Sequence, residues 1–312
     1  ARSFRTTHIN HVIQHGTTSL RVFGRVSSPG LAQPVPMGIE RSVAETRIRI
    51  NNESVNKTSS LAAILPVQII NPDVHKILEQ GPKYRRQFLD WGVFHVEHGF
   101  LEAWQQYHRI LRQRNAALRS KSNDSTIKHW DLMLVEQGLF ISTMRQRYLQ
   151  ALQPFVAYYC QRLIGLVPEM SYQQGWSQDQ DLAESLRQGL ERDKLQGYTR
   201  SGPHRADVVV KQDGVAVQSS FSRGQQKMLV SALRLAQIAH LKEQHQQTPI
   251  LLVDDLAAEL DQAHRMELLN LLVESGAQLF VTVTEAELLD LSHWLADVKM
   301  FHVEHGQVTE VV

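Results

Sequence analysis

Several features are scarce in this 312-residue sequence, and their scarcity narrows its possible functions. A single cysteine excludes a disulfide framework and a cysteine-based zinc site, and it fits a reducing compartment. No apolar run approaches the ~18 residues that a membrane span needs. No charged segment followed by an apolar stretch opens the chain, as it would in a secretion signal. Charge of one sign is also lacking: 33 Lys and Arg residues stand against 32 Asp and Glu residues, so any charged surface must come from uneven distribution.

What is present is the composition of a globular protein, with 42% hydrophobic and 21% charged residues. At ~100–200 residues per domain, the length allows one large domain or two lobes. The apolar pattern divides the chain into a β-rich part (1–75), a helical part (76–196) and an α/β part (197–312). We interpret this order as one α/β lobe interrupted by a helical lobe, with strands from the two ends of the chain pairing with each other.

In the first two parts, the period of the apolar residues indicates the type of element. Residues 19–26 and 45–51 alternate as half-buried strands do, whereas the proline-rich stretch 27–36 predicts a surface loop. The runs 100–118, 132–166 and 182–195 have helical spacing, and we expect Pro154 to break or kink the second of them.

The last part alternates strands with helices. Continuous apolar runs at 249–253 and 279–283 predict buried strands. The remaining predictions are a hairpin turn at 212–214 after a strand at 207–211, helices at 222–245, up to 275 and near 285–295, and a terminal hairpin around Gly306.

Two carboxylates directly follow the first of these buried strands. Asp254 and Asp255 come after Ile250-Leu251-Leu252-Val253, at the end of the strand where open α/β sheets bind ligands. Asp254 is placed to hold Mg²⁺ on a nucleotide, and Asp255 to orient an attacking water. A buried strand that runs into an acidic helix start is the alternative.

The start of the long helix at 222–245 is suited to an anion. Ser222 and Gln225 fit a capping box, in which each side chain satisfies a backbone N–H of the other residue. Gly224 leaves the amides of the first turn open to close approach, and Arg223 and Lys227 add positive charge. These features suit a phosphate better than plain capping requires.

A third segment, Leu256-Ala257-Ala258-Glu259-Leu260-Asp261, follows the paired acids. By itself it predicts only that Asp261 caps a helix that begins near Gln262.

Together the three segments resemble the ABC class of ATPases, whose members share a signature loop, a Walker B strand and a D-loop in this order and at about this spacing. The signature resembles residues 222–227, Walker B residues 250–255, and the D-loop residues 258–261. In the ABC class the second acid of Walker B is more usually Glu. Asp255 at this position therefore narrows the number of ABC families that the sequence resembles.

The narrower resemblance is to the RecF family of bacterial DNA replication and repair proteins. Residues 81–90 (GPKYRRQFLD) are similar to that family's Arg-Arg-x-Phe-Leu-Asp segment, and residues 201–207 (SGPHRAD) to its Gly-Pro-His-Arg-x-Asp segment. Residues 113–118 (QRNAAL) match in the helical part. The resemblance runs in order along the chain, and it implies an α/β fold: an ABC-type, P-loop NTPase-like head with an inserted α-helical lobe.

One motif of this class is missing. A Gly-rich loop of the form G-x-x-x-x-G-K-[ST] holds the phosphates in such ATPases, but no Gly-Lys dipeptide occurs in this sequence. In the RecF family the loop lies near the N-terminus, and residues 1–5 resemble the segment just after it. We therefore expect the head to be incomplete here by one βαβ unit of ~30 residues or more. A natural variant that has lost the loop is the alternative.

The resemblance also implies cofactors, partners and a location. The expected cofactors are ATP and Mg²⁺, and the expected assembly is an ATP-dependent homodimer in which the signature of one subunit completes the γ-phosphate site of the other. The expected partners are single-stranded and gapped DNA, RecO, RecR and the RecA recombinase, in the bacterial cytoplasm and the response to DNA damage. The family's weak DNA-dependent ATPase activity is expected to be absent from a chain without the Gly-rich loop.

Two further ATP-site residues are placed by the same resemblance. Gln68 is the candidate for the loop that senses the γ-phosphate, and Thr282 or Thr284 for the position of the usual switch histidine. Glutamine at a strand end and threonine in a strand are also ordinary structural choices.

DNA contact requires cations on one surface, because phosphates supply most of the affinity. Arg112 and Arg119 lie seven residues apart and so share a helix face. A solvated face is the alternative for such a run, and ion pairs between the lobes are the alternative for Arg85 and Arg86. The candidates for DNA binding are Arg85, Arg86, Arg112, Arg114 and Arg119.

Two features and two rival functions stay open. The hexapeptide Phe-His-Val-Glu-His-Gly occurs at 94–99 and again at 301–306 without the helical spacing of a zinc protease site, and it predicts no function. His204 lies inside a matched motif and has no assigned role. The rival functions are a structural head of the SMC kind, whose long heptad coiled coils this helical part lacks, and a non-catalytic fragment that binds DNA or a partner without ATP.

Overall fold

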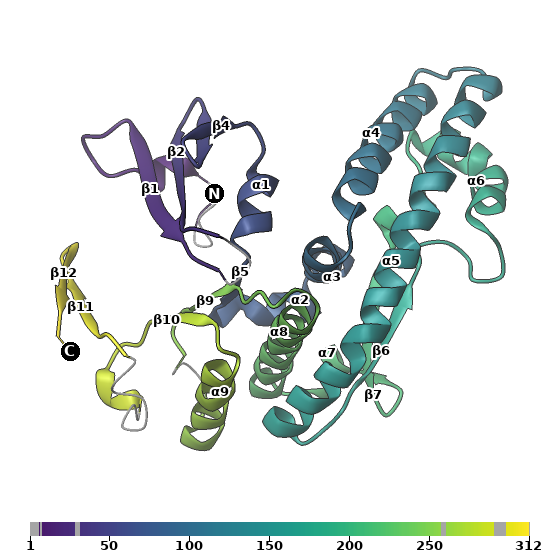
Figure 1. Ribbon diagram of the computed structural model, residues 1–312. Helices are drawn as coiled ribbons and strands as arrows, with labels where there is room; N and C mark the ends of the chain where they lie inside the picture. Colours follow the sequence, from purple (N-terminus) through teal and green to yellow (C-terminus); the bar gives the residue numbers. More distant parts are fainter. Residues whose placement is uncertain (1–5, 7, 29–31, 257–259, 290–297, 312) are drawn as a thin grey trace.

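The structure is a computed structural model that describes residues 6, 8–28, 32–256, 260–289 and 298–311. Figure 1 shows a β-rich region next to a small parallel sheet, and a long helical region that projects to the other side. In the described part of the chain, no helix combines the length and the apolar character needed to cross a membrane.

A three-stranded parallel sheet joins distant parts of the sequence. Its order is β10 (Gln278–Val281), β9 (Ile250–Val253), β5 (Val67–Ile70), so β9 is central, and Gln68 lies opposite Leu251 in the register. Leu251 and Val253 are almost fully buried, as expected for an apolar strand between two neighbours. The predicted pairing between strands from the two ends of the chain is confirmed.

The β-rich region is a four-stranded antiparallel sheet with the order β1 (Ser19–Val26), β2 (Val35–Ser42), β3 (Thr46–Ile50), β4 (Glu53–Val55). Asn51 and Asn52 both have positive φ in the tight turn between β3 and β4, which asparagine tolerates better than most residues. The loop predicted at 27–36 ends earlier than expected, because β2 already begins at Val35 and includes Pro36. A 3-10 turn (Ile9–His11) precedes this sheet and helix α1 (Thr58–Ile64) follows it.

The helical region consists of α3 (Pro82–Val96), α4 (Phe100–Arg119), α5 (Asp124–Ile164) and α6 (Leu182–Gln196). Before them lie a 3-10 turn (Pro72–His75) and α2 (Lys76–Glu79). Of the predicted break or kink at Pro154, the break is wrong, since the 41-residue helix α5 includes Pro154 in its interior. The packing of α5 against α4 and α8 offsets the backbone hydrogen bond that proline removes.

A second small sheet connects the helical region to the chain that follows it. Strand β6 (Glu169–Gln173) pairs antiparallel with β7 (Asp207–Gln212), which continues through a turn at Asp213-Gly214 into β8 (Val215–Ala216). The helical pattern did not predict β6. The domain boundary predicted between residues 196 and 197 would place the paired strands β6 and β7 in different domains. The division into domains stays a prediction.

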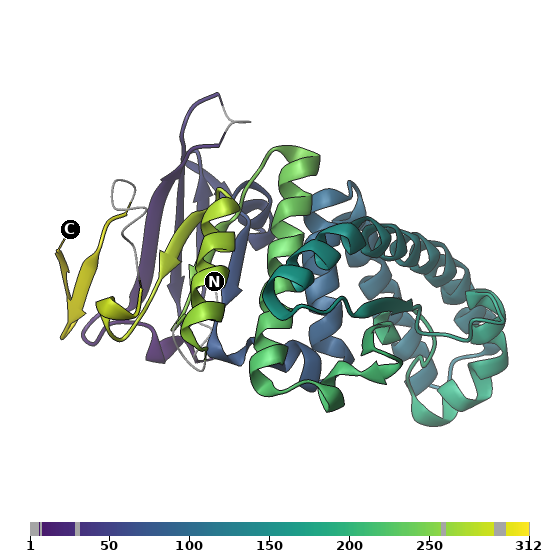
Figure 2. The same cartoon turned by 90° about the horizontal axis from the view of Figure 1, so that it is seen from below.

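The core is formed around α8 (Arg223–His245), which lies between the parallel sheet and α5 (Figure 2). A short helix α7 (Val217–Ser220) precedes it, and α9 (Gln262–Glu274) packs beside it. One hydrophobic cluster includes residues of α3, α4, α5, α8, α9, β5 and β9. The parallel sheet and the helical region therefore share a single core.

The repeated hexapeptide adopts two different structures. Residues 94–96 end helix α3, and Gly99 at φ 82° precedes α4. In the second copy, residues 301–304 form β11 (Phe301–Glu304), which pairs with β12 (Gln307–Glu310) across a turn at His305 and Gly306. The terminal hairpin is thus confirmed. Of the helix predicted near 285–295, the structure describes only a 3-10 turn (Ala286–Leu288), and residues 290–297 lie outside the described part.

Candidate functional site

The two acids after β9 lie at the carboxyl end of the parallel sheet. The Asp254 N–H donates to the Ile70 carbonyl oxygen at the end of β5 (2.8 Å), so the backbone stays in sheet register up to this residue. Asp255 then turns the chain with φ 54°, in the left-handed region that aspartate adopts more readily than most residues. Both side chains are half-buried at the edge where open α/β sheets bind ligands.

Thr282, the residue after β10, connects the two acids. Its hydroxyl donates to Asp254 Oδ1 (2.8 Å) and accepts the backbone N–H of Asp255 (3.0 Å). Its own N–H donates to the Val253 carbonyl oxygen (2.9 Å), and its carbonyl oxygen accepts the Leu256 N–H (3.3 Å). The structure thus brings Thr282 to the predicted site, against the acids.

A small pocket opens beside these acids. Asp254, Asp255 and Lys227 line it, together with Asn71 and Ser231, which the sequence analysis did not identify. Asn71 directly follows β5, and Ser231 lies one turn after Lys227 on α8. A polar residue directly after a strand of the sheet was the available signal for Asn71.

The capping box at the start of α8 is confirmed. Ser222 Oγ accepts the Gln225 N–H (3.3 Å), and Gln225 Oε1 accepts the Ser222 N–H (2.9 Å). Ser222, Arg223 and Gln225 are exposed, and a Cβ added at Gly224 would meet no atom within 4 Å. Lys227, in contrast, is buried and lines the pocket beside Asp254. The start of α8 therefore exposes Ser222, Arg223 and Gln225 to solvent. Its Lys227, in contrast, belongs to the site within the same chain.

Asp261 caps α9 as predicted. Its Oδ1 accepts the His264 N–H (2.9 Å), and its Oδ2 lies 2.7 Å from His264 Nδ1. The backbone N–H of His264 and then its side chain lower the pKa of this carboxyl. Residues 258 and 259 of the predicted D-loop lie outside the described part.

Gln68 is not brought to the pocket. Its side chain is 1% exposed; Nε2 donates to Gln237 Oε1 (3.1 Å), and Oε1 accepts from Arg234 Nη1 (2.9 Å). Gln237 in turn donates to the Phe88 carbonyl oxygen (2.8 Å). The prediction that Gln68 contacts a phosphate directly is therefore wrong for this structure. Side chains alternate between the two faces of a strand, and that of residue 68 points toward α8.

The donors around Asp254 fit Mg²⁺. Carboxylate and amide oxygens from Asp254, Asp255 and Asn71 are the hard ligands that this ion prefers. Across the described residues, no group of three or more His, Cys, Asp or Glu side chains is arranged to hold a metal alone. A Mg²⁺ site usually takes one or two carboxylates and is completed by substrate phosphates.

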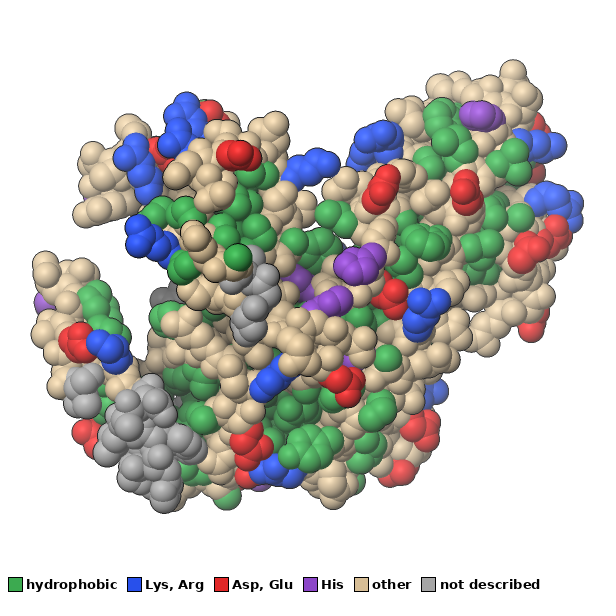
Figure 3. Space-filling model, in the orientation of Figure 1, with side chains coloured by type: hydrophobic (Ala, Val, Ile, Leu, Met, Phe, Trp, Pro, Cys, Tyr) green, Lys and Arg blue, Asp and Glu red, His purple; other side chains and the backbone are tan. Residues whose placement is uncertain are grey.

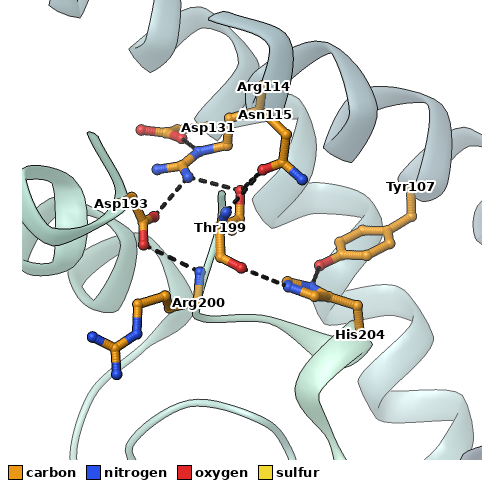
Figure 4. Close-up of polar contacts among 8 residues, drawn as sticks. All are labelled: Tyr107, Arg114, Asn115, Asp131, Asp193, Thr199, Arg200 and His204. Atoms are coloured by element: carbon orange, nitrogen blue, oxygen red, sulfur yellow. Dashed lines mark hydrogen bonds and ion pairs between the residues drawn. The ribbon is translucent and has the colours of Figure 1, made fainter. Parts of the chain in front are cut away.

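Arg114 is a correction among the predicted DNA contacts. Its side chain is fully buried and donates to Asp131 (Nε, 2.5 Å) and to Asp193 and Thr199 (Nη1, 2.7 and 2.8 Å), as Figure 4 shows. A side chain with no accessible surface does not reach DNA. The spacing of the helix already placed residue 114 with the buried positions 107, 111 and 118.

Arg85 and Arg86 are also engaged within the protein. Arg85 makes a two-pronged ion pair with Asp207 (both 2.8 Å) and donates to the Leu78 carbonyl oxygen. Arg86 donates to the Ala206 carbonyl oxygen (2.7 Å), and burial lowers the pKa of its guanidinium. The prediction that Arg85 contacts DNA is wrong, because its side chain is buried. The alternative, a structural ion pair, applies to this residue.

Arg112 and Arg119 are exposed on α4, as DNA contact requires. The sequence analysis overlooked Arg200 and Arg205, which are exposed on the loop between α6 and β7. This loop also approaches α4, since a Cβ added at Gly197 would lie 3.0 Å from Arg119 Cγ. Arg200, Arg119 and Arg112 thus belong to neighbouring elements at the outer end of the helical region.

His204 has a structural role in the same loop. Its Nε2 donates to the Thr199 carbonyl oxygen (3.0 Å) and its Nδ1 accepts the Tyr107 hydroxyl (2.6 Å) (Figure 4). A carbonyl oxygen only accepts, so Nε2 carries a proton, and Nδ1 accepts from Tyr107 when the ring is neutral. Burial lowers the pKa of His204 to about 4.

The fold and the comparisons with known proteins agree on the class of protein. Residues 1–309 match the family model described as the RecF/RecN/SMC N terminal domain, so the chain is an ABC-type, SMC-like ATPase head with a mixed α/β fold. A solved structure described as the recombination mediator protein RecF with ATP in the RecFOR pathway superposes with a TM-score of 0.86. It is 22% identical, and the match covers 100% of this chain and 85% of that one.

Curated relatives narrow this class to one family. The chain is 43% identical over 316 residues to the DNA replication and repair protein RecF of Stutzerimonas stutzeri, covering all of this chain and 85% of the relative. It is 40% identical over 309 residues to the RecF of Thioalkalivibrio sulfidiphilus, covering 97% and 84%. The chain belongs to the RecF family of DNA replication and repair proteins.

Proposed function

We propose that this chain is an ATP-dependent DNA-binding protein of recombinational repair and replication-fork maintenance. The observation that carries the proposal is the acidic pair Asp254-Asp255 at the end of the central parallel strand, held by Thr282 and flanked by Lys227. This is the placement that a Mg²⁺-nucleotide site in an open α/β sheet requires.

Asp254 would hold Mg²⁺ on the nucleotide, and Asp255 would orient the attacking water. Mg²⁺ supplies charge neutralisation at the transferred phosphate when it is bound. The backbone N–H groups of both acids are held, that of Asp254 by the Ile70 carbonyl oxygen and that of Asp255 by the Thr282 hydroxyl. No Gly-Lys dipeptide of a Gly-rich phosphate loop occurs in this sequence, and a complete phosphate site of the family's kind would need such a loop.

The exposed start of α8 would serve a second copy of the chain. Ser222 and the open first-turn amide at Gly224 form an anion-binding helix N-terminus that faces solvent. It would complete the γ-phosphate site of a partner head, so that ATP binding stabilises the dimer. The solved RecF-ATP structure supports ATP as the nucleotide.

The DNA would lie against the exposed cations of the helical region. Figure 3 shows an open notch between the sheet of β1–β4 and the outer end of the helical region, with Lys and Arg side chains on both sides and acids scattered between them. Arg112 and Arg119 are the predicted contacts, to which we add Arg200 and Arg205. RecO, RecR and a recombinase are the proposed partners, in line with the RecFOR pathway of the solved relative.

The test uses the protein encoded by the complete gene. We expect it to bind ATP, to dimerise only with ATP, and to bind gapped DNA, with dimerisation measured by analytical ultracentrifugation. D254N should abolish Mg²⁺-dependent nucleotide binding, and S222R should block dimerisation while leaving ATP binding intact. A wild-type protein that binds neither ATP nor gapped DNA would refute the proposal.

The proposed DNA surface has its own test. R112Q and R119Q should each lower the slope of log affinity against log salt by about one, as loss of one phosphate contact does. R187Q is the control, because Arg187 is an exposed arginine on α6 that pairs with Glu184. Equal slopes for all three variants would remove this face as the DNA site.

A further inference from the structure

The geometry points to Thr282 as a positioning residue that clamps the acidic turn and acts on the nucleotide site only through Asp254 and Asp255. This inference rests on the proposed function, because it concerns the residues that would hold Mg²⁺. It assigns Thr282 a role other than the direct nucleotide contact expected from the position of a switch histidine.

The direction of the hydrogen bonds carries the first step. A hydroxyl has one proton and two lone pairs. The Thr282 hydroxyl directs its proton to Asp254 Oδ1 at 2.8 Å, since a carboxylate only accepts, and it receives the Asp255 N–H at 3.0 Å. With its single proton committed to Asp254, this hydroxyl does not donate to a phosphate at the same time.

The backbone carries the second step. Asp255 is one of few non-glycine residues in the structure with positive φ, at 54°. Such a conformation persists where surrounding contacts hold it. The contacts here are the Thr282 hydroxyl on the Asp255 N–H and the Thr282 carbonyl oxygen on the Leu256 N–H (3.3 Å). One residue at the end of β10 thus fixes two successive amides after β9.

The arrangement of the sheet explains why residue 282 can do this. Strands β9 and β10 are parallel neighbours in register, with Val253 opposite Val281, so the residues that follow them emerge side by side. The Thr282 N–H donates to the Val253 carbonyl oxygen (2.9 Å), which extends the ladder by one bond. The side chain of Thr282 therefore emerges beside Asp254, with its hydroxyl next to the carboxylate.

The consequence is that the hydroxyl, and not the size of the side chain, orients the metal-binding carboxylate. Loss of a partner that orients a ligand typically weakens metal binding by about 10–100-fold. T282V keeps the branched shape without the hydroxyl, whereas T282S keeps the hydroxyl. T309V is the control, an exposed threonine on β12 to which no role in the site is assigned.

The experiment measures the affinity of the chain for Mn²⁺ alone by electron paramagnetic resonance, and the hydrogen exchange rate of the Asp255 amide by NMR. We expect T282V to raise the Mn²⁺ dissociation constant about tenfold or more and to speed exchange at Asp255. T282S and T309V should stay within about twofold of wild type in both measurements. Unchanged Mn²⁺ affinity in T282V, or an equal loss in T309V, would overturn the inference.

D254N separates this inference from the proposed function. If D254N leaves Mn²⁺ binding unchanged, the metal site itself is misplaced and the proposed function fails. If D254N abolishes Mn²⁺ binding while T282V does not weaken it, the metal site stands and the positioning role of Thr282 is refuted.

Discussion

Arg114 shows how a single charged residue can stabilise an entire region. Its guanidinium joins α4 to Asp131 on α5 and to Asp193 on α6, and the latter side chain is 2% exposed. Asn115 extends the contact by accepting both the N–H and the hydroxyl of Thr199 (2.8 and 2.7 Å). The buried charges are compensated, so removal of one partner should cost far more free energy of unfolding than removal of an exposed arginine.

We expect R114M to destabilise the protein by about 3–5 kcal/mol, because Asp193 would be left buried without a counter-charge. The measurement is urea unfolding followed by circular dichroism. R112M on the same helix is the control and should change stability by no more than about 0.5 kcal/mol, since Arg112 is exposed. Equal losses in the two variants would contradict the structural role of Arg114.

His204 makes stability dependent on pH. Its pKa is lowered from the usual 6.5 to about 4 by burial, so the unfolded chain takes up a proton at higher pH than the folded one. The contribution of neutral His204 to the free energy of unfolding is complete above pH 6.5. It is lost as the pH falls from 6.5 to about 4, and the loss is at most about 3 kcal/mol. His95, whose pKa is also lowered to about 4 by burial, acts in the same direction.

Unfolding in urea at pH 7, 5.5 and 4.5 tests this dependence. H204Q should be less stable than wild type at pH 7, where it loses the bonds to Tyr107 and Thr199, but should lose less stability on acidification. H129Q, at an exposed position on α5, should keep the slope of the wild type. An unchanged slope in H204Q would assign the pH dependence to other groups.

At the scale of elements, two glycines with opposite surroundings allow a matched comparison. Gly175, between β6 and α6, has φ 94°, and an added Cβ would lie 2.3 Å from the Gly202 carbonyl oxygen. Gly189 lies inside α6 with open space around it. The close approach of two backbone segments requires glycine at position 175. At position 189, glycine only weakens the helix.

We therefore expect G175A to destabilise the protein by about 3 kcal/mol or more, from the strained backbone and the clash. G189A should stabilise it by about 0.5–1 kcal/mol, as an alanine does in a helix interior. Thermal unfolding monitored by circular dichroism measures both changes. A G175A protein as stable as wild type would show that the Gly175–Gly202 approach is not fixed.

The elements also show what the sequence could and could not predict. The apolar runs at β9 and β10, the hairpin turn at 212–214 and the capping box of Ser222 are local signals, and all were predicted. Strand β6 and the continuous α5 were not, because each depends on tertiary partners: β7 for the first, and α4 and α8 for the second. The same reason explains Gln68 and Arg114, whose residue types suggested a ligand although their neighbours bury them.

At the scale of the whole molecule, the core is unevenly shared. The main cluster joins the parallel sheet to the helical region across α8, whereas the β1–β4 sheet contributes only Met37 and Ile48 to the buried hydrophobic residues in the described part of the chain. Phe23 and Val22 on its edge strand β1 are 72% and 57% exposed. This sheet should therefore have the lower local stability.

Native-state hydrogen exchange should resolve this difference. Amides of β1–β4 should exchange through openings that cost less free energy than those of α8 and β9, which should exchange only by global unfolding. The two sets should differ in their response to low concentrations of urea. Coincident opening free energies for β2 and α8 would contradict an uneven core.

The hexapeptide shared by residues 94–99 and 301–306 gives the molecule an internal reference. Its two copies have identical covalent structure, but one ends a helix and the other forms a hairpin with exposed residues. Any difference between their Cα chemical shifts in one NMR spectrum comes from surroundings alone, without a model peptide or a second sample. A linear antibody epitope in this segment would likewise occur twice in the unfolded chain and in two distinct shapes in the native one.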